Sequence, residues 1–203
     1  MTLRKVLFSA LPAVLFAAGC SSLPELEEPD PIPVCIASYR ASELIGKAEH
    51  VAVALDVDDC VEAALLVSKG VFGGSSVDAA YPVRVGIERE FLRVIDQNFC
   101  EPTGGDHLKI RVSTMRVLLT KSGRTCTSDV SVTVRLMHSD ETRGPLFRKT
   151  YRVKSSSRSD DEDLVPKCFY ESVQNIAEQF VTDVASNRNL VWYLEAKQKE
   201  MDK

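Results

Sequence analysis

Histidines and a short run of aspartates are the side chains of this chain that suit proton transfer or metal binding. The three histidines are His50, His107 and His138, and no two of them have the spacing of metal ligands on one element. Asp56 and Asp58 lie two residues apart, so an extended strand places both carboxylates on one face. No glycine turn or closing glutamate completes a calcium loop there. We therefore expect solvated strand ends, with no metal, no cofactor and no catalytic residue.

Cysteines are the second group with reactive side chains. No two of them form a C-x-x-C motif, which argues against a zinc ribbon or a thioredoxin-type redox site. They lie at Cys20, Cys35, Cys60, Cys100, Cys126 and Cys168. The first of them follows a hydrophobic N-terminal run and three small residues, and its position points to a role different from that of the others.

Residues 1–19 have the features of a bacterial export signal. Arg4 and Lys5 form a positive start, and "VLFSALPAVLF" is an apolar stretch too short for a comfortable membrane span. "AAG" then precedes Cys20, and this arrangement resembles the bacterial lipobox, whose cysteine receives a diacylglyceryl group before cleavage. We therefore expect a signal peptide over 1–19 and lipidation of Cys20.

Acylation at Cys20 would make the membrane the first partner of this chain. Each buried CH2 contributes roughly 0.8 kcal/mol, and two or more acyl chains anchor a protein stably. Ser21 follows the cysteine, where lipoproteins retained in the inner membrane of Gram-negative bacteria carry Asp. In such a host we expect the outer membrane, with the protein facing the periplasm.

The composition indicates an ordinary folded domain on an acidic linker. The 203 residues are 44% hydrophobic and 27% charged, and the net charge of -4 argues against a nucleic-acid partner. Prolines and acids dominate "SSLPELEEPDPIPV", which predicts an extended, solvated tether over 20–37. A single periplasmic domain is expected over 38–203.

Hydrophobic periodicity predicts the elements of that domain in the order β-α-β-β-β-α. Strands are expected in "HVAVALDV", "HLKIRV…MRV", "VSVTVRL" and "LFRKTYRV", with a β-bulge near Ser113 and Thr114. A helix is predicted from about 81 to 98 and a second around 169–184, with Asn187 as its C-terminal cap. The first half of "VEAALLVSKGVFGGSS" suits a short helix, and its second half a loop. The fold class is α+β, a two-layer sandwich with a mostly antiparallel four-stranded sheet and helices on one face.

Topology suggests which cysteines meet, because export places them in an oxidising compartment. In a parallel β-α-β unit, Cys126 and Cys168 lie at one end of the sheet. Cys35 and Cys100 lie at the other end. We expect Cys126–Cys168 as the first disulfide and Cys35–Cys100 as the second, with Cys60 free or competing.

Two hydrophobic features are candidate partner contacts. Val71 and Phe72 lie in the glycine-rich "GVFGGSS", which lacks the lysine and spacing of a phosphate-binding loop. Trp192 and Tyr193 are amphipathic aromatics of the kind found at interfaces, and packing on the protein's own sheet is their alternative role.

The chain resembles the small YajG-type lipoproteins of Gram-negative bacteria over roughly 51–199. The likeness lies in the lipobox, in "RVGIEREFLRVIDQNF" and in the ending "ESVQNIAEQFVTDVASNRNLVWYL". A looser likeness exists to auxiliary lipoproteins of envelope transport machines. These resemblances imply a periplasmic sheet-and-helix domain without catalytic residues. We expect an accessory or assembly factor that binds an envelope protein; an envelope hydrolase or a carrier of a lipid or glycan stays as the alternative.

Overall fold

The computed structural model describes most of the expected domain. The described ranges are 38–58, 63–69, 75–103, 106–160 and 164–201. The predictions for the signal peptide, the tether, Cys20, Cys35, Cys60, Val71 and Phe72 fall outside these ranges. No helix in the described ranges is long and apolar enough to cross a membrane.

Three long antiparallel strands form the larger part of the sheet, as their alternating sequences predict. They are β4 (Leu108–Ser122), β5 (Thr125–His138) and β6 (Phe147–Arg158). Gly123 turns β4 into β5 with a φ of 55°, a conformation that glycine adopts without strain. The register shifts between Thr114 and Arg116, so the predicted bulge is present and Met115 is its extra residue.

The first strand, β1 (Val53–Val57), runs parallel to the first part of β4, on the edge of β4 opposite β5. The helix α1 (Val83–Asn98) lies between these two strands in the sequence. The parallel pairing and the intervening helix confirm the expected β-α-β arrangement. The apolar positions of α1, spaced by three and four residues, are buried: Val83, Ile87, Phe91, Val94 and Ile95.

The segment after β1 differs from its prediction. The expected short helix is wrong, because the residues form β2 (Ala63–Lys69), which pairs antiparallel with β3 (Ser75–Pro82). The far end of β4 pairs in parallel with β2, so the order is β3-β2-β4-β5-β6, with β1 beside β4. The four expected strands are thus joined by two more, in one six-stranded sheet.

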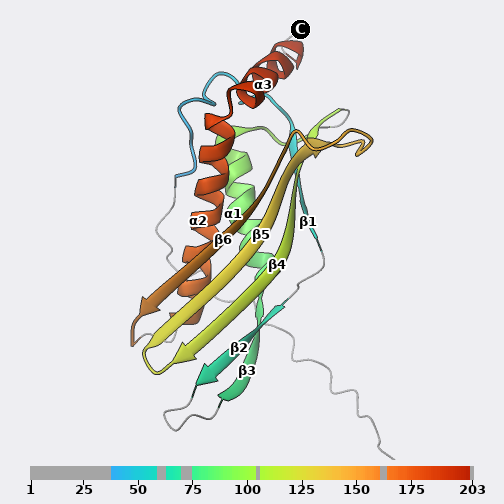
Figure 1. Cartoon of the computed structure of the whole chain (residues 1–203). Helices are drawn as coiled ribbons and strands as arrows, with labels where there is room; N and C mark the ends of the chain where they lie inside the picture. Colours follow the sequence, from blue (N-terminus) through green and yellow to red (C-terminus); the bar gives the residue numbers. More distant parts are fainter. Residues whose placement is uncertain (1–37, 59–62, 70–74, 104–105, 161–163, 202–203) are drawn as a thin grey trace, which may run out of the picture.

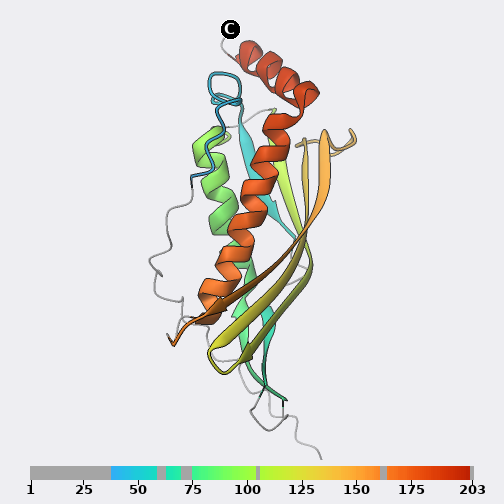
Figure 2. The same cartoon turned by 60° about the vertical axis from the view of Figure 1, so that its left-hand side comes forward.

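Both long helices lie on the same face of the sheet (Figures 1 and 2). The longer one, α2 (Leu164–Ser186), runs along β5 and β6 and packs beside α1. Gly86 of α1 makes this packing close, because a Cβ there would lie 2.5 Å from Phe169 Cε1. The α+β class and the placement of helices on one face are confirmed.

The last helix, α3 (Arg188–Met201), follows α2 after a single residue and turns away from it (Figure 2). Asn187 is the joint: its backbone N–H donates to the carbonyl of Asp183 at 3.1 Å. Its side-chain oxygen accepts from the N–H of Leu190 at 3.2 Å. Asn187 therefore caps the start of α3, a function that the prediction of a C-terminal cap for α2 did not include.

Candidate functional site

Trp192 and Tyr193 are adjacent on α3 and have opposite surroundings. The hydroxyl of Tyr193 lies 3.2 Å from Nε2 of His138, and the two rings stand edge to face. Trp192 leaves 71% of its surface exposed. Tyr193 thus connects α3 to the end of β5. Trp192 remains a candidate for contact with a partner.

His138 is buried, so the expectation of a solvated histidine at this strand end is wrong. The cause is α3, which covers the end of β5 and supplies Tyr193 as a hydrogen-bond partner. His50 is exposed and His107 is half-buried. Within the described ranges, no three His, Cys, Asp or Glu side chains gather as metal ligands would.

A shallow hollow of about 410 Å3 lies beside Trp192. Its wall combines the start of α3 with the segment before β1. Charges of both signs surround the indole there: Glu43, Lys47, Arg188 and Glu195. Such a polar rim around one large exposed aromatic is the usual anatomy of a protein contact site.

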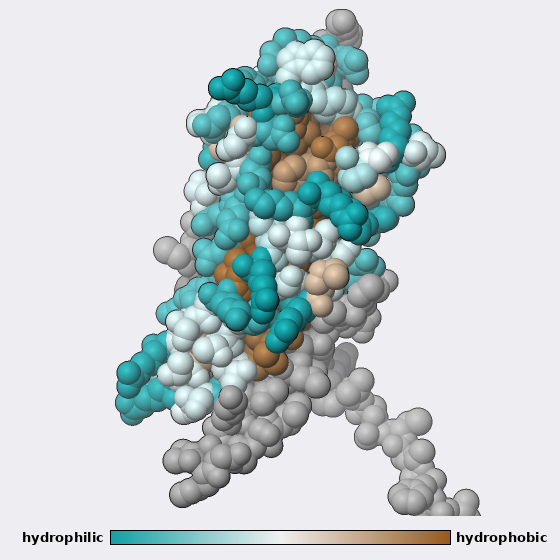
Figure 3. Space-filling view, viewed as in Figure 1, coloured by the Kyte–Doolittle hydropathy of each residue, from teal (hydrophilic) through white to brown (hydrophobic). Residues whose placement is uncertain are grey.

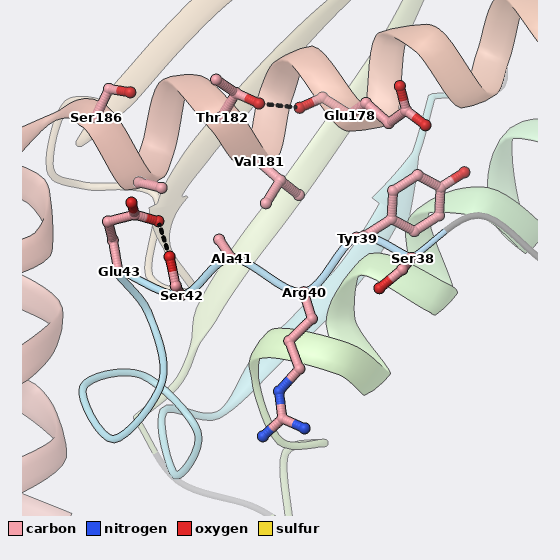
Figure 4. Close-up of a pocket in the computed structure, with 11 residues that line it drawn as sticks. Ser38, Tyr39, Arg40, Ala41, Ser42, Glu43, Glu178, Val181, Thr182 and Ser186 are labelled. Atoms are coloured by element: carbon pink, nitrogen blue, oxygen red, sulfur yellow. Dashed lines mark hydrogen bonds between the residues drawn. The ribbon is translucent and has the colours of Figure 1, made fainter.

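A second hollow, also of about 410 Å3, separates the segment 38–43 from α2 (Figure 4). The hydroxyls on its walls are engaged locally. Ser42 donates to Glu43 at 3.0 Å, and Thr182 donates to the backbone carbonyl of Glu178 at 2.8 Å. Both of these hydroxyls are therefore held by hydrogen bonds to groups that are close to them in the sequence.

Tyr39 closes the inner side of this hollow and satisfies a buried charge. Glu90 of α1 has no exposed surface, and its carboxylate accepts the Tyr39 hydroxyl at 2.7 Å. Arg93 and Arg89 donate to the same carboxylate at 3.2 and 3.1 Å. Burial, and then the hydrogen bond to Glu90, raise the pKa of Tyr39. The arrangement ties the start of the domain to α1.

Cys126 and Cys168, predicted as a pair, are neighbours in the core. Cys126 lies on β5 and Cys168 in the second turn of α2, and both are completely buried. The Cys168 thiol donates to the Cys126 carbonyl, with sulfur and oxygen 3.3 Å apart. Both residues are thiols in this structure. The predicted location of the pair is therefore confirmed, while the bond between them stays a prediction.

Serine hydroxyls surround this pair of thiols. Ser155 and Ser172 lie 2.8 Å apart, and Ser128 hydrogen-bonds to both. The Ser155 hydroxyl lies 3.7 Å from the Cys168 sulfur. The Cys126 thiol and then the serines lower the pKa of Cys168, whereas the hydrogen bond to Cys168 and burial raise the pKa of Cys126. Of the second predicted pair, the structure describes only Cys100, which is half-buried.

Asp56 of β1 and Asp58, which follows the strand, are paired with polar side chains of β4. Asp56 accepts a hydrogen bond from Arg111 Nε at 2.7 Å, and Asp58 accepts one from Ser113 at 3.1 Å. Glu141 also accepts from Arg111, at 2.5 Å. A guanidinium beside the carboxylate favours a structural ion pair, the opposite of what a cation site needs.

No family model and no curated protein matches this chain. The fold resembles a crystal structure from Xanthomonas campestris described under the family model DUF330, at a TM-score of 0.50 and 15% identity. That match covers 77% of this chain and 90% of the other.

Two solved lipoproteins are more distant neighbours. One is a putative lipoprotein from Caulobacter crescentus, at TM-score 0.32 and 12% identity, covering 55% of this chain and 80% of that one. The other is a minor lipoprotein from Acinetobacter baumannii, at TM-score 0.36 and 10% identity, covering 70% and 95%. The match to the Xanthomonas campestris structure, at 15% identity, extends to the fold and not to a function.

One group of residues with functional potential was not predicted from the sequence. It is a set of arginines and lysines on the face of β4, β5 and β6 that the helices leave open. Motif spacing gives no sign of it, since its members come from three strands. A count of charge along the chain would have found it.

Proposed function

We propose that this chain is a lipid-anchored protein of the bacterial cell envelope that acts by binding, as an accessory or assembly factor, and not by catalysis. Its anchor is the acylated Cys20 and its location the outer membrane of a Gram-negative host, with the domain in the periplasm. The YajG-type resemblance is part of the same proposal. The leader, the small residues before Cys20, and Ser21 support the anchoring and the location.

The observation that carries the binding function is the exposure of Trp192 on a helix that Tyr193 holds firmly. A large aromatic that stays exposed on a fixed element loses little conformational entropy on binding. Tryptophan is also among the residues that contribute most to protein interfaces. The partner that suits this site is an envelope protein with an apolar pocket for the indole and with charges complementary to those around Trp192.

The anchor is tested by replacing Cys20 with Ala and separating membranes from soluble protein. We expect the wild-type chain to incorporate labelled fatty acid, and Cys20→Ala to lose the label. Cys35→Ala is the matched control, because it removes a nearby cysteine and should keep the label. Incorporation of label into Cys20→Ala would contradict the proposal. Separation of the two membranes on a density gradient tests the location.

The binding site is tested by a photo-crosslinking amino acid at position 192 in intact cells. Leu92 of α1 is the control position, since it is a hydrophobic side chain exposed to 45% on another helix. A discrete crosslinked product from position 192, absent from position 92 and competed by the wild-type protein, is expected. Identical products from the two positions would show that Trp192 marks no specific contact.

A further inference from the structure

Positive charge is concentrated in one continuous part of this acidic chain. Between residues 108 and 158 there are 12 Lys and Arg but only 3 Asp and Glu, whereas the whole chain has a net charge of -4. That part forms β4, β5 and β6, the three long antiparallel strands. The net charge of the whole chain therefore gives no sign of the local excess of positive charge in these three strands.

Strand register places most of these cations on the face that points away from α1 and α2. Arg111 pairs with Arg135 on β5, and Arg135 pairs with Arg148 on β6. Three arginines thus form one row across three strands, although like charges placed directly opposite each other destabilise a sheet. Arg111 has acidic partners, but the Nε of Arg135 is buried with no hydrogen-bond partner among the described residues.

A second group of cations lies further along the same face. Asp129 is its one carboxylate, with Arg152 at 2.7 Å, Arg116 at 3.8 Å and Lys154 at 3.9 Å. The side chains of all three cations are more than half exposed. One carboxylate cannot neutralise three cations, so this group retains an excess of positive charge. Arg158, also exposed, lies on this face at the end of β6.

Two exposed hydrophobic side chains accompany the cations on β4. Met115, the bulged residue, is 66% exposed, and Leu118, which pairs with Asp129, is 36% exposed. Arg116 lies between them in the sequence. Figure 3 shows hydrophilic residues over the long strands, with smaller hydrophobic areas between them. Basic residues around a few apolar side chains are the pattern of a surface that settles on a lipid interface.

We propose that this basic face of β4, β5 and β6 docks on the anionic phospholipid headgroups of the membrane that holds the chain. The inference rests on the proposed lipid anchor, which brings the domain to the bilayer. The 18 residues of the tether span at most about 60 Å when fully extended, so they allow contact. Guanidinium groups bind phosphate oxygens in pairs, and an open sheet face suits an extended charged surface better than it suits a small ligand.

The experiment uses the full lipidated protein in vesicles. Trp192 is the single tryptophan in the chain, and Trp192→Phe removes it. Met115→Trp in this background then places the only tryptophan on the basic face. The vesicles contain phosphatidylcholine alone or with phosphatidylglycerol, each with brominated acyl chains that quench a nearby indole. Leu92→Trp in the same background reports from the helix side.

We expect quenching of the tryptophan at position 115 with phosphatidylglycerol, weakening as salt is added, and little in phosphatidylcholine alone. The tryptophan at position 92 should stay unquenched in both. Replacing three exposed cations by Gln, at Arg148, Lys154 and Arg158, should lower the docking equilibrium constant on the order of 100-fold. The matched control, with Gln at Lys167, Arg188 and Lys199, removes the same charge elsewhere and should leave docking unchanged.

Equal quenching at position 115 in both kinds of vesicle, or equal losses in the two triple variants, would overturn the docking proposal. Absence of quenching, together with a crosslink from position 115 to an acidic envelope protein, would assign the face to a protein partner instead. Flotation with phosphatidylcholine vesicles tests the anchor separately. A chain that fails to float with them lacks the anchor, whatever its response to phosphatidylglycerol.

Discussion

At the scale of single residues, the buried neighbours Cys126 and Cys168 lead to the first prediction. A chain exported as proposed would meet thiol oxidants, and the Cys168 sulfur lies 3.3 Å from the carbonyl oxygen of Cys126. We expect a Cys126–Cys168 disulfide in protein isolated from the envelope, joining β5 to α2. Closing a loop of this length stabilises the folded state by about 4 kcal/mol in the chain-entropy model.

Mass spectrometry of peptides from unreduced protein checks this bond. Cys100→Ser should leave the joined peptide unchanged, which makes it the matched control. Alkylation of both residues in unreduced, denatured protein would show that the pair stays reduced. A peptide joining Cys60 to either residue would reassign the bond.

Tyr39 gives a second prediction at this scale. Tyr39→Phe removes the hydroxyl that donates to the buried Glu90, without opening a cavity. A buried carboxylate that loses a hydrogen bond costs about 1–3 kcal/mol, so the free energy of unfolding should fall by that amount. Chemical denaturation measures the change. Ser42→Ala, which breaks an exposed contact with Glu43, should have almost no effect, and equal effects would refute this explanation.

At the scale of elements, Gly86 sets the distance between α1 and α2. Gly86→Ala should raise the helix propensity of α1 by about 1 kcal/mol. The added Cβ nevertheless meets the rings of Phe169 and Tyr170, and such overpacking costs about 1–3 kcal/mol. We expect a net loss of stability in thermal denaturation. Gly144→Ala, at a position with no atom within 4 Å of the new Cβ, is the control and should change little.

Elements with a clear hydrophobic period could be predicted from the sequence. Apolar residues alternate along β4, β5 and β6, with one interruption at the bulge in β4, and α1 and α2 carry apolar stripes, so the sequence predicts all five. The run "AALLVSK" has no alternation, and a short apolar run of this kind suits a helix as well as a strand. Its pairing with β3 and β4 is a tertiary effect, which explains why β2 was missed.

The candidate sites likewise could be predicted only where they do not depend on tertiary detail. The meeting of Cys126 with Cys168 followed from topology, because strand direction fixes which ends come together. The different surroundings of Trp192 and Tyr193 did not follow, since they depend on where α3 turns after Asn187. The excess of cations over 108–158 is visible in the sequence, but their placement on one face of the sheet needed the strand register.

At the scale of the whole molecule, the separation of charge predicts unusual behaviour on ion exchangers. The chain has a pI of about 5.5, yet one face of its sheet is basic. We expect the detergent-solubilised protein to be retained by a cation exchanger at pH 7 and low salt, despite its negative net charge. Changing Arg148, Lys154 and Arg158 to Gln should abolish the retention. Changing Lys167, Arg188 and Lys199 should preserve it, and a reverse result would place the basic region elsewhere.

The strand β6 ends the described sheet on one side, and its free edge has a consequence for self-association. An unpaired edge is a template for strand addition by another copy, which is how many β-proteins aggregate. Arg148, Lys149, Arg152, Lys154 and Arg158 stand along this one strand. A second β6 laid against it would bring two series of cations together without intervening acids. Neutralising these residues would therefore remove a barrier against fibril formation, above all at the high local concentrations that the proposed membrane anchor would create.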